Sequence, residues 1–168
     1  MIRGNLPKLF AILLLLSTLC SCSESVRLQH CELGIVLPSE FEEYDSDGSF
    51  DASYFDGELI VGMTRVSFVA AMDDGIPTTL TPLRFAEVYR GRIDREDSEI
   101  KELGDVPYFT YTVTTDDGRE YIYIPTFYVT PYAYFVIMFI TSAGNERWNQ
   151  ESILELTRSV YIDPEAMK

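Results

Sequence analysis

The sequence predicts an α+β fold in which a mainly antiparallel β-sheet is sandwiched by helices. Residues 106–141 hold half of the chain's aromatic residues but only four charges, and these fall together at Asp116, Asp117, Arg119 and Glu120. A short charged turn between two apolar, alternating runs is typical of a β-hairpin. The run 132–140 is apolar on both alternations, which predicts a central strand buried on both faces. We therefore expect a sheet with a covering layer on each side.

The Asp117-Gly118 pair predicts the register of this hairpin. Asp-Gly is a favoured two-residue connection, so Asp116 is expected opposite Arg119. The strand pairs that follow are Val113 with Ile122, Tyr111 with Ile124, Thr112 with Tyr123, and Thr114 with Tyr121. Pro125 cannot donate a hydrogen bond to a neighbouring strand and is expected to kink or bulge the second strand.

Strands and two helices are expected in the rest of the chain. Residues 26–37 indicate a first strand, ended by Pro38, in which Cys31 packs as a small hydrophobic side chain. Asp-Gly turns bracket two further strand segments, SFDASYF and ELIVGMTRVSFVAAM. Thr81-Pro82 is a typical helix start and Gly91 a typical end. A short strand at 98–103 follows the helix, and a last helix is expected over 146–159.

The first 21 residues predict a bacterial lipoprotein signal peptide. Arg3 and Lys8 precede an apolar run over 9–16, which is too short to span a membrane comfortably, and small or polar residues follow it. The end of this segment, Leu19-Cys20-Ser21-Cys22, resembles a lipobox in which Cys22 receives the lipid; an ordinary cleaved signal or an uncleaved anchor is the alternative. We expect a tether at 22–25, one domain over 26–168, and a lipid-anchored, extracytoplasmic protein of the bacterial cell envelope.

The negative net charge argues against nucleic acids and anionic lipids as partners. The chain has 27 acidic residues against 13 Lys and Arg, a net charge of −14, and loss of the leader with Arg3 and Lys8 would make it −16. Such a surface repels nucleic acid phosphates and anionic lipid headgroups. We expect no nucleic-acid partner. Cys31 is the single cysteine of the domain over 26–168, so no internal disulfide is expected.

The acidic segment 43–54 partly imitates a calcium-binding loop. The residues that match the third, fifth, sixth and ninth places of such a loop are Asp45, Asp47, Gly48 and Asp51. The first place is Glu43, the twelfth is Tyr54 where a bidentate Glu is needed, and strands flank the segment. A solvated acidic loop is the simpler interpretation. Calcium is the one cofactor that the sequence suggests, and stabilisation by calcium that is lost in Asp47→Asn would support it.

Three tyrosines are candidate binding residues, Tyr121, Tyr123 and Tyr128, because tyrosine offers rigid amphipathic area at interfaces. Packing beneath a helix is the alternative for all three. His30, the only histidine, has no recognisable partner for catalysis or metal binding. No nucleophile elbow, phosphate loop or metal-spaced cluster is present in the sequence, so no catalysis is expected. A hydrolase that uses paired carboxylates remains the enzymatic alternative, because acidic residues are plentiful.

The order of elements resembles the PsbP-like family. The resemblance rests on the ELIVGMTR strand, the TPLRFAEVYR helix, the aromatic hairpin that ends in YFVIMFIT and the closing ILELTRSVYI. The family includes small bacterial lipoproteins of largely unassigned function, a photosystem subunit and a nuclear factor that binds the Ran GTPase. The resemblance implies an α/β/α sandwich, and members of the family mostly act by binding other proteins. It assigns no functional residue to any position. The Cys22 anchor, the acidic surface and the absence of a catalytic motif predict a binding or accessory module whose partner is another envelope protein.

Overall fold

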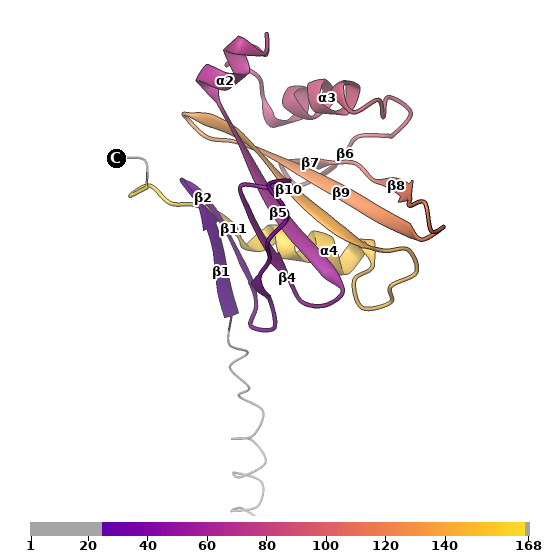
Figure 1. Ribbon diagram of the computed structural model, residues 1–168. Coiled ribbons are helices and arrows are strands. Elements are labelled where there is room, and N and C mark those ends of the chain that lie inside the picture. The colour runs from indigo at the N-terminus through magenta and orange to yellow at the C-terminus, as the bar shows by residue number, and fades with distance from the viewer. Residues whose placement is uncertain (1–24, 167–168) are drawn as a thin grey trace, which may run out of the picture.

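The computed structural model describes residues 25–166 and confirms the α+β sandwich (Figure 1). An eight-stranded antiparallel sheet has the order β3-β4-β5-β10-β9-β7-β6, and β8 also pairs with β9. Its strands are β3 (Glu42–Glu43), β4 (Ala52–Phe55), β5 (Leu59–Ser67), β6 (Lys101–Leu103), β7 (Val106–Tyr108), β8 (Tyr111–Thr114), β9 (Glu120–Val129) and β10 (Ala133–Ser142). One face carries the helices α2 (Phe68–Asp73) and α3 (Pro82–Arg92). The other face carries α4 (Gln150–Leu156) and a three-stranded sheet of β1 (Ser25–His30), β2 (Leu33–Pro38) and β11 (Val160–Ile162).

The central strand β10 is buried on both faces, as its sequence predicts. All residues from Ala133 to Phe139 are buried, and β10 pairs with β5 on one side and β9 on the other. Its alternating side chains enter two separate cores. Phe135, Ile137 and Phe139 pack with the β1-β2 hairpin and α4, whereas Tyr134 and Val136 pack against α2 and α3.

The helix α3 begins where the sequence predicts it. The Thr81 hydroxyl accepts a hydrogen bond from the Arg84 amide, and Pro82 occupies the first helical position. Phe85 of α3 stacks on Tyr134 with ring centroids 4.4 Å apart. The Tyr134 hydroxyl donates to the Pro77 carbonyl at 2.5 Å and accepts from the Leu80 amide. The central strand therefore holds both α3 and the segment that leads into it.

The expected first strand over 26–37 is wrong, because the segment forms the β1-β2 hairpin. Cys31 lies in the turn with a φ of 50° and is exposed, so it does not pack as a small hydrophobic residue. Glu32, the next residue, is 3% exposed. In a single continuous strand, Leu28 would point to the face opposite Leu33 and Ile35. The turn at Cys31 and Glu32 reverses the chain, so that all three leucine and isoleucine side chains enter one core.

Glu32 joins the small sheet to the large one. Its carboxylate accepts a hydrogen bond from the Thr130 hydroxyl at 2.8 Å and pairs with the Arg65 guanidinium at 3.3 Å. Thr130 lies between β9 and β10, and Arg65 lies in β5. Burial opposes ionisation of Glu32, but these contacts outweigh it and the pKa of the carboxyl group is lowered from 4.5. The ionised Glu32 side chain therefore links the two sheets through a hydrogen bond and an ion pair.

Two helix starts differ from the sequence prediction. Residues 68–73 were expected to continue a strand, but the Ser67 side chain accepts a hydrogen bond from the Ala70 amide and caps α2. A hydroxyl at this position satisfies a free amide and favours a helix over further sheet. The last helix begins at Gln150 rather than at 146, because Asn149 is its cap.

The β8-β9 hairpin differs from the predicted register by one residue. Its loop holds three residues, 116–118, because the Thr115 amide donates to the Arg119 carbonyl and the Gly118 amide donates to the Thr115 carbonyl. Gly118 has a φ of 80°, the left-handed conformation that a three-residue turn of this type requires. The observed pairs are Tyr111 with Tyr123, Thr112 with Ile122, Val113 with Tyr121, and Thr114 with Glu120.

This register decides which side chains share a face. Tyr121 and Tyr123 lie on the same face as Tyr111, while Ile124 turns into the core beneath the β1-β2 hairpin. Pro125 lies in β9 between the part that pairs with β8 and Thr126, which pairs with β7. The proline therefore coincides with the position at which β9 changes its neighbour.

Candidate binding face

The helices α2 and α3 cover only part of the sheet face on which they lie. They cover Phe127, Tyr134 and Val136, and in Figure 1 the sheet continues beyond them toward the β8-β9 turn. Farther along the same face, side chains are only half-buried. We call five of these residues the open face: Ile60, Tyr111, Tyr121, Tyr123 and Ile140.

The aromatic rings of the open face are ordered by one another. Tyr111 and Tyr123 stack with centroids 5.1 Å apart and an interplanar angle of 20°. The Arg95 guanidinium lies 5.0 Å from the centroid of the Tyr111 ring. Burial, with the neighbouring tyrosines, raises the pKa of Tyr111 to about 12, although Arg95 acts in the opposite direction. The Tyr111 ring is therefore a neutral amphipathic surface at physiological pH.

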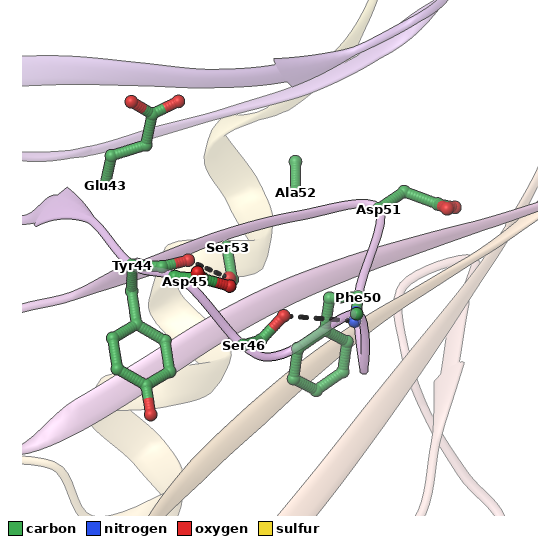
Figure 2. Close-up of a pocket in the computed structure, with 9 residues that line it drawn as sticks. Glu43, Tyr44, Asp45, Ser46, Phe50, Asp51, Ala52 and Ser53 are labelled. Atoms are coloured by element: carbon green, nitrogen blue, oxygen red, sulfur yellow. Dashed lines mark hydrogen bonds between the residues drawn. The ribbon is translucent and has the colours of Figure 1, made fainter.

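Three adjoining hollows extend along the open face and its neighbouring loop. The first, of about 560 Å³, is lined by residues 43–53 of the β3-β4 segment without Asp47 and Ser49 (Figure 2). The second, of about 260 Å³, shares Tyr44 and Phe50 with the first and reaches Tyr123. The third, of about 330 Å³, shares Ile60 and Ile140 with the second and reaches Tyr121. We call the three together the trough.

The lining of the trough is aromatic and acidic. Its rings come from Tyr44, Phe50, Phe55, Tyr121 and Tyr123. Its acidic residues are Glu43, Asp45, Asp51 and Glu58, whereas none of its lining residues is Lys, Arg or His. The trough therefore combines apolar area with a negative potential.

Phe50 forms a wall of the trough by lying on Gly62. A Cβ atom at Gly62 would meet the Phe50 ring at 2.4 Å. Only glycine leaves room for this ring against β5. The ring is held at the sheet because the Phe50 amide donates to the Ser46 hydroxyl at 3.2 Å and the neighbouring Asp51 amide donates to the Met63 carbonyl.

Gly62→Ala is expected to displace Phe50 and lower the free energy of unfolding by about 1–3 kcal/mol, the usual cost of overpacking. The nearest atom is Cγ of the Phe50 ring, so rotation of the ring about χ2 does not relieve the contact. Urea unfolding followed by the fluorescence of Trp148, the single tryptophan, measures the effect. In a Phe50→Ala background the same glycine substitution should cost less than half as much, since the clashing ring is absent. An equal cost in both backgrounds would contradict this account.

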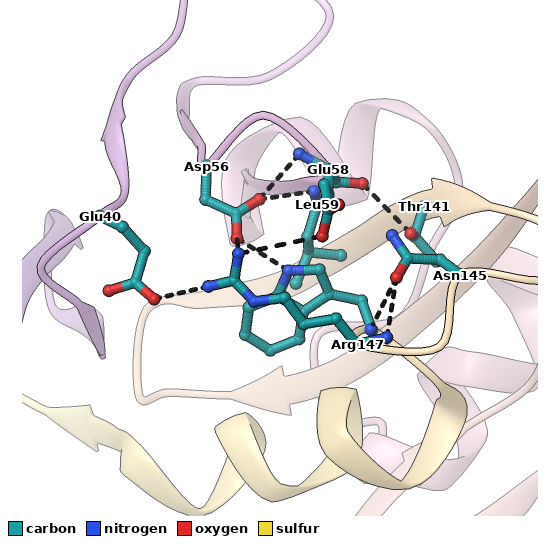
Figure 3. Close-up of polar contacts among 8 residues, drawn as sticks. Glu40, Asp56, Glu58, Leu59, Thr141, Asn145 and Arg147 are labelled. Carbon is teal, nitrogen blue, oxygen red and sulfur yellow. Dashed lines mark hydrogen bonds and ion pairs between the residues drawn. The ribbon is translucent and has the colours of Figure 1, made fainter.

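A polar cluster closes the far end of the trough (Figure 3). The Asp56 side chain is fully buried and accepts hydrogen bonds from the Glu58 and Leu59 amides and, at 2.7 Å, from the Trp148 indole. Arg147 pairs with Glu40 and with Asp56, at 2.5 and 3.3 Å. The cluster holds the loop between β10 and α4 against the β4-β5 turn.

The structure separates the three predicted tyrosines. Tyr121 lines the third hollow and Tyr123 the second. Tyr128 lies on the opposite face of β9, against the core beneath the β1-β2 hairpin. Its hydroxyl is buried without a hydrogen-bond partner among residues 25–166, and burial raises its pKa. Tyr128 therefore does not share a surface with the other two.

The three aspartates of the imitation calcium loop do not converge. Asp45 accepts a hydrogen bond from the Asp47 amide at 3.0 Å, whereas Asp51 accepts one from the Arg65 amide at 2.7 Å. In Figure 2 the Asp51 carboxylate points away from Asp45. Within the described part of the chain, no group of three or more His, Cys, Asp or Glu residues is placed to hold a metal ion.

Of the other predicted positions, His30 borders the trough and Cys22 is not among the described residues. His30 ends β1, and its Nε2 lies 4.0 Å from the carboxylate of Asp51, which lines the loop hollow. Cys22, the predicted lipidation site, lies outside the described residues. Over residues 25–166, no helix has the length and apolar character needed to cross a membrane.

Sequence reasoning missed the loop contribution to the trough. Tyr44 and Phe50 stand in the segment that was interpreted as a solvated acidic loop, and Ile60 and Ile140 were assigned to core strands. The available signal was the pair of aromatic residues on either side of Asp47-Gly48. An aromatic residue in an otherwise polar loop indicates contact with the body of the protein or with a partner.

Comparisons with known proteins show a similarity of fold. No family model and no curated protein matches this sequence. A crystal structure from Bacteroides thetaiotaomicron VPI-5482 matches with a TM-score of 0.54 and 13% identity, over 79% of this chain and 46% of that one. The chain thus spans about half the length of that protein. The solution structure of cyanobacterial PsbP from Synechocystis sp. PCC 6803 also matches, with a TM-score of 0.43 and 13% identity, over 86% of this chain and 95% of that one.

The likeness is one of fold. A PsbP is among the similar solved structures. The antiparallel sheet, the two helices on one face and the further helix on the other are observed in this chain itself. Assignment of function depends on the chain's own surface.

Proposed function

We propose that this protein is a non-catalytic accessory module of the bacterial cell envelope that binds another protein through the trough. A lipid on Cys22 tethers it to a membrane on the extracytoplasmic side. The observation that carries the proposal is the half of a sheet face that α2 and α3 leave uncovered, with ordered aromatic rings at its surface. Exposed apolar area of this kind, edged by polar residues, is typical of interaction sites.

The carboxyl groups support binding over hydrolysis. A hydrolase with paired carboxylates needs a general acid whose pKa is raised toward neutrality. Among residues 25–166, the pKa values of Glu32, Asp117 and Asp163 are lowered from those of the free carboxyl groups. For Glu32 the lowering has a structural cause in Thr130 and Arg65. The surroundings of these three carboxyl groups favour their ionised form, as expected of groups that stabilise the fold.

Photo-crosslinking tests the proposed interface. The full-length chain, expressed in a bacterial host with its leader intact, receives p-benzoyl-phenylalanine in place of Tyr121 or Tyr123. Tyr132, which is 51% exposed and lies in the β9-β10 turn, is the matched control position. We expect one covalent adduct, identified by mass spectrometry, from the two open-face positions and none from the control. The Cys22→Ala chain should give at least tenfold less adduct, because the unanchored protein is diluted away from its partner.

The outcomes separate the parts of the proposal. Equal labelling from Tyr121, Tyr123 and Tyr132 indicates random collision and removes the open face as an interface. A specific adduct of undiminished yield from Cys22→Ala keeps the interface and removes the anchor from the function. Absence of any protein adduct at Tyr121 and Tyr123 overturns the proposal.

A further inference from the structure

We infer that the trough receives a basic segment of the partner, with Lys or Arg side chains at one end and apolar side chains beyond them. This inference rests on the proposed function and specifies its ligand. Each basic side chain lies between the aromatic rings and the carboxylates at the loop end of the trough, and apolar side chains fill the hollows over the sheet. Three observations lead to this assignment.

The first observation is charge. The loop hollow contains Glu43, Asp45 and Asp51 within its lining, and the third hollow contains Glu58. No salt bridge among residues 25–166 involves Glu43 or Asp45, whereas Asp51 lies 4.0 Å from His30 and Glu58 lies 3.9 Å from Arg147. Exposed carboxylates without a cationic partner, beside aromatic rings, attract a cationic ligand and repel an anionic one.

The second observation is that the open face already seats one guanidinium. Arg95 lies 5.0 Å from the Tyr111 ring at one end of the face, and Tyr111 stacks on Tyr123, which lines the trough. Arg147 lies in the same way 5.0 Å from the Trp148 ring. Tyrosine and tryptophan faces hold Arg through cation–π attraction. Tyr44 presents the same kind of ring between the first and second hollows and is 41% exposed.

The third observation is the order of the hollows. The acidic hollow joins the second through Tyr44 and Phe50, and the second joins the third through Ile60 and Ile140. A single small cation occupies one hollow only. An extended peptide advances about 3.3 Å per residue and sends alternate side chains to the same side, so the side chains on its inner side reach first the acidic hollow and then the apolar ones. This arrangement favours a polypeptide over a free organic cation.

Two synthetic nonapeptides test the inference on the full-length chain in neutral detergent micelles. One has the sequence Arg-Ser-Arg-Ser-Leu-Ser-Leu-Ser-Leu, whose alternate positions place Arg and then Leu on one side, and the other replaces every Arg by Glu; both carry a fluorescent label, and anisotropy reports binding. We expect the Arg peptide to bind at least tenfold more tightly than the Glu peptide. Binding should weaken as salt rises from 50 to 500 mM, because the charges are near the surface and are screened.

Matched charge variants distinguish a site from general attraction to an acidic protein. Glu43→Gln with Asp45→Asn removes two charges from the trough, and Glu99→Gln with Glu102→Gln removes two charges near β6, away from it. The trough pair should weaken the Arg peptide roughly three- to tenfold, as expected for two exposed ion pairs. The β6 pair should change binding less than twofold. Equal losses from both pairs overturn the inference.

Tyr44 separates cation recognition from simple apolar contact. Tyr44→Phe retains a π face and should bind the Arg peptide within twofold of the unaltered chain. Tyr44→Leu retains apolar area but lacks the ring, and should bind about threefold more weakly. Equal affinity of the Phe and Leu variants removes the aromatic part of the site. A nonapeptide with Lys in place of Arg should bind with the same order of affinity.

The inference and the proposed function can fail separately. If Tyr121 and Tyr123 crosslink a partner whose adduct is unaffected by salt and by the Glu43→Gln, Asp45→Asn pair, the interface stands and the basic segment is wrong. If the open-face positions capture no protein at all, the proposed function fails, whatever the nonapeptides do.

Discussion

Asp56→Ala is expected to lower the free energy of unfolding by about 3 kcal/mol. The Asp56 side chain is fully buried and is the common acceptor for the Leu59 amide and the Trp148 indole. Its removal leaves buried donors without a partner and leaves Arg147 without its inner carboxylate. Each unsatisfied donor costs about 1–3 kcal/mol, and loss of one member of a buried charge pair adds to this.

Urea denaturation followed by far-ultraviolet circular dichroism measures this loss. Trp148 emission should also shift to the red in the folded variant, because the indole loses its partner and the loop that it anchors becomes looser. Asp116→Ala, at an exposed position of the β8-β9 turn, is the control and should stay within about 0.5 kcal/mol of the unaltered protein. A loss below about 1 kcal/mol in Asp56→Ala would show that the cluster in Figure 3 contributes little to stability.

The Asp56 cluster also bears on the proposed site. Gly57 and Glu58, on one side of the cluster, and Asn145, on the other, line the third hollow. The Thr141 hydroxyl donates to the Glu58 carbonyl at 3.1 Å and ties β10 to the same turn. Loss of Asp56 should therefore reduce peptide binding at the third hollow as well as stability. The loop hollow at the other end should remain, because its hydrogen bonds lie within residues 44–53 and to β5.

Glu32→Ala is expected to cost about 3 kcal/mol at neutral pH. The Glu32 side chain is 4% exposed, and its removal deprives both the Arg65 guanidinium and the buried Thr130 hydroxyl of their acceptor. A partly buried cation without its carboxylate pays a desolvation penalty that nothing offsets. Because the contact spans β1-β2, β5 and the β9-β10 turn, the loss should appear in global unfolding. Chemical denaturation at pH 7 measures it, with Glu99→Ala as an exposed control expected to change stability by less than 0.5 kcal/mol.

The contribution of Glu32 should depend on pH in one direction. Its pKa in the folded protein is lowered from 4.5, so folding favours the ionised form. This stabilisation is fully present above the pKa of the unfolded chain and is lost as pH falls through the lower, folded value. Glu32→Gln keeps the shape and removes the titration, so the stability difference between the two proteins should be largest near pH 7 and shrink below pH 4. A constant difference from pH 7 to pH 3 would contradict the assignment.

Local patterns predicted those elements whose causes are local. The run 132–140 is apolar in both alternations, and β10 is buried over 133–139. Thr81-Pro82 supplies a cap and a first helical residue within two positions, and α3 begins there. Ser67 caps α2 in the same way through its hydroxyl group. This cap was not predicted from the sequence, because the preceding strand pattern continues past Ser67. The β1-β2 turn was missed because Cys31 and Glu32 are not typical turn residues and one of them is buried.

The candidate site depended on register and on distant contacts. A hairpin loop of three residues rather than two moved Tyr121 and Tyr123 to the face that they share with Tyr111. A shift of one residue exchanges the two faces of a strand relative to its neighbour, and Asp-Gly alone does not distinguish loops of two and three residues. The sequence offers three tyrosines of β9 as candidate binding residues, with packing beneath a helix as the alternative, and two of the three lie on the open face.

The amino-acid sequence by itself determined the α+β class, the buried central strand and the acidic character of this protein, because alternation, caps and charge are properties of neighbouring residues. Only the tertiary structure decided where the trough lies. Phe50, Ile60, Tyr123 and Ile140 belong to four segments and meet because Gly62 admits a ring against the sheet and because α2 and α3 end before the sheet does. Such a surface depends on packing between distant segments, which no local pattern encodes.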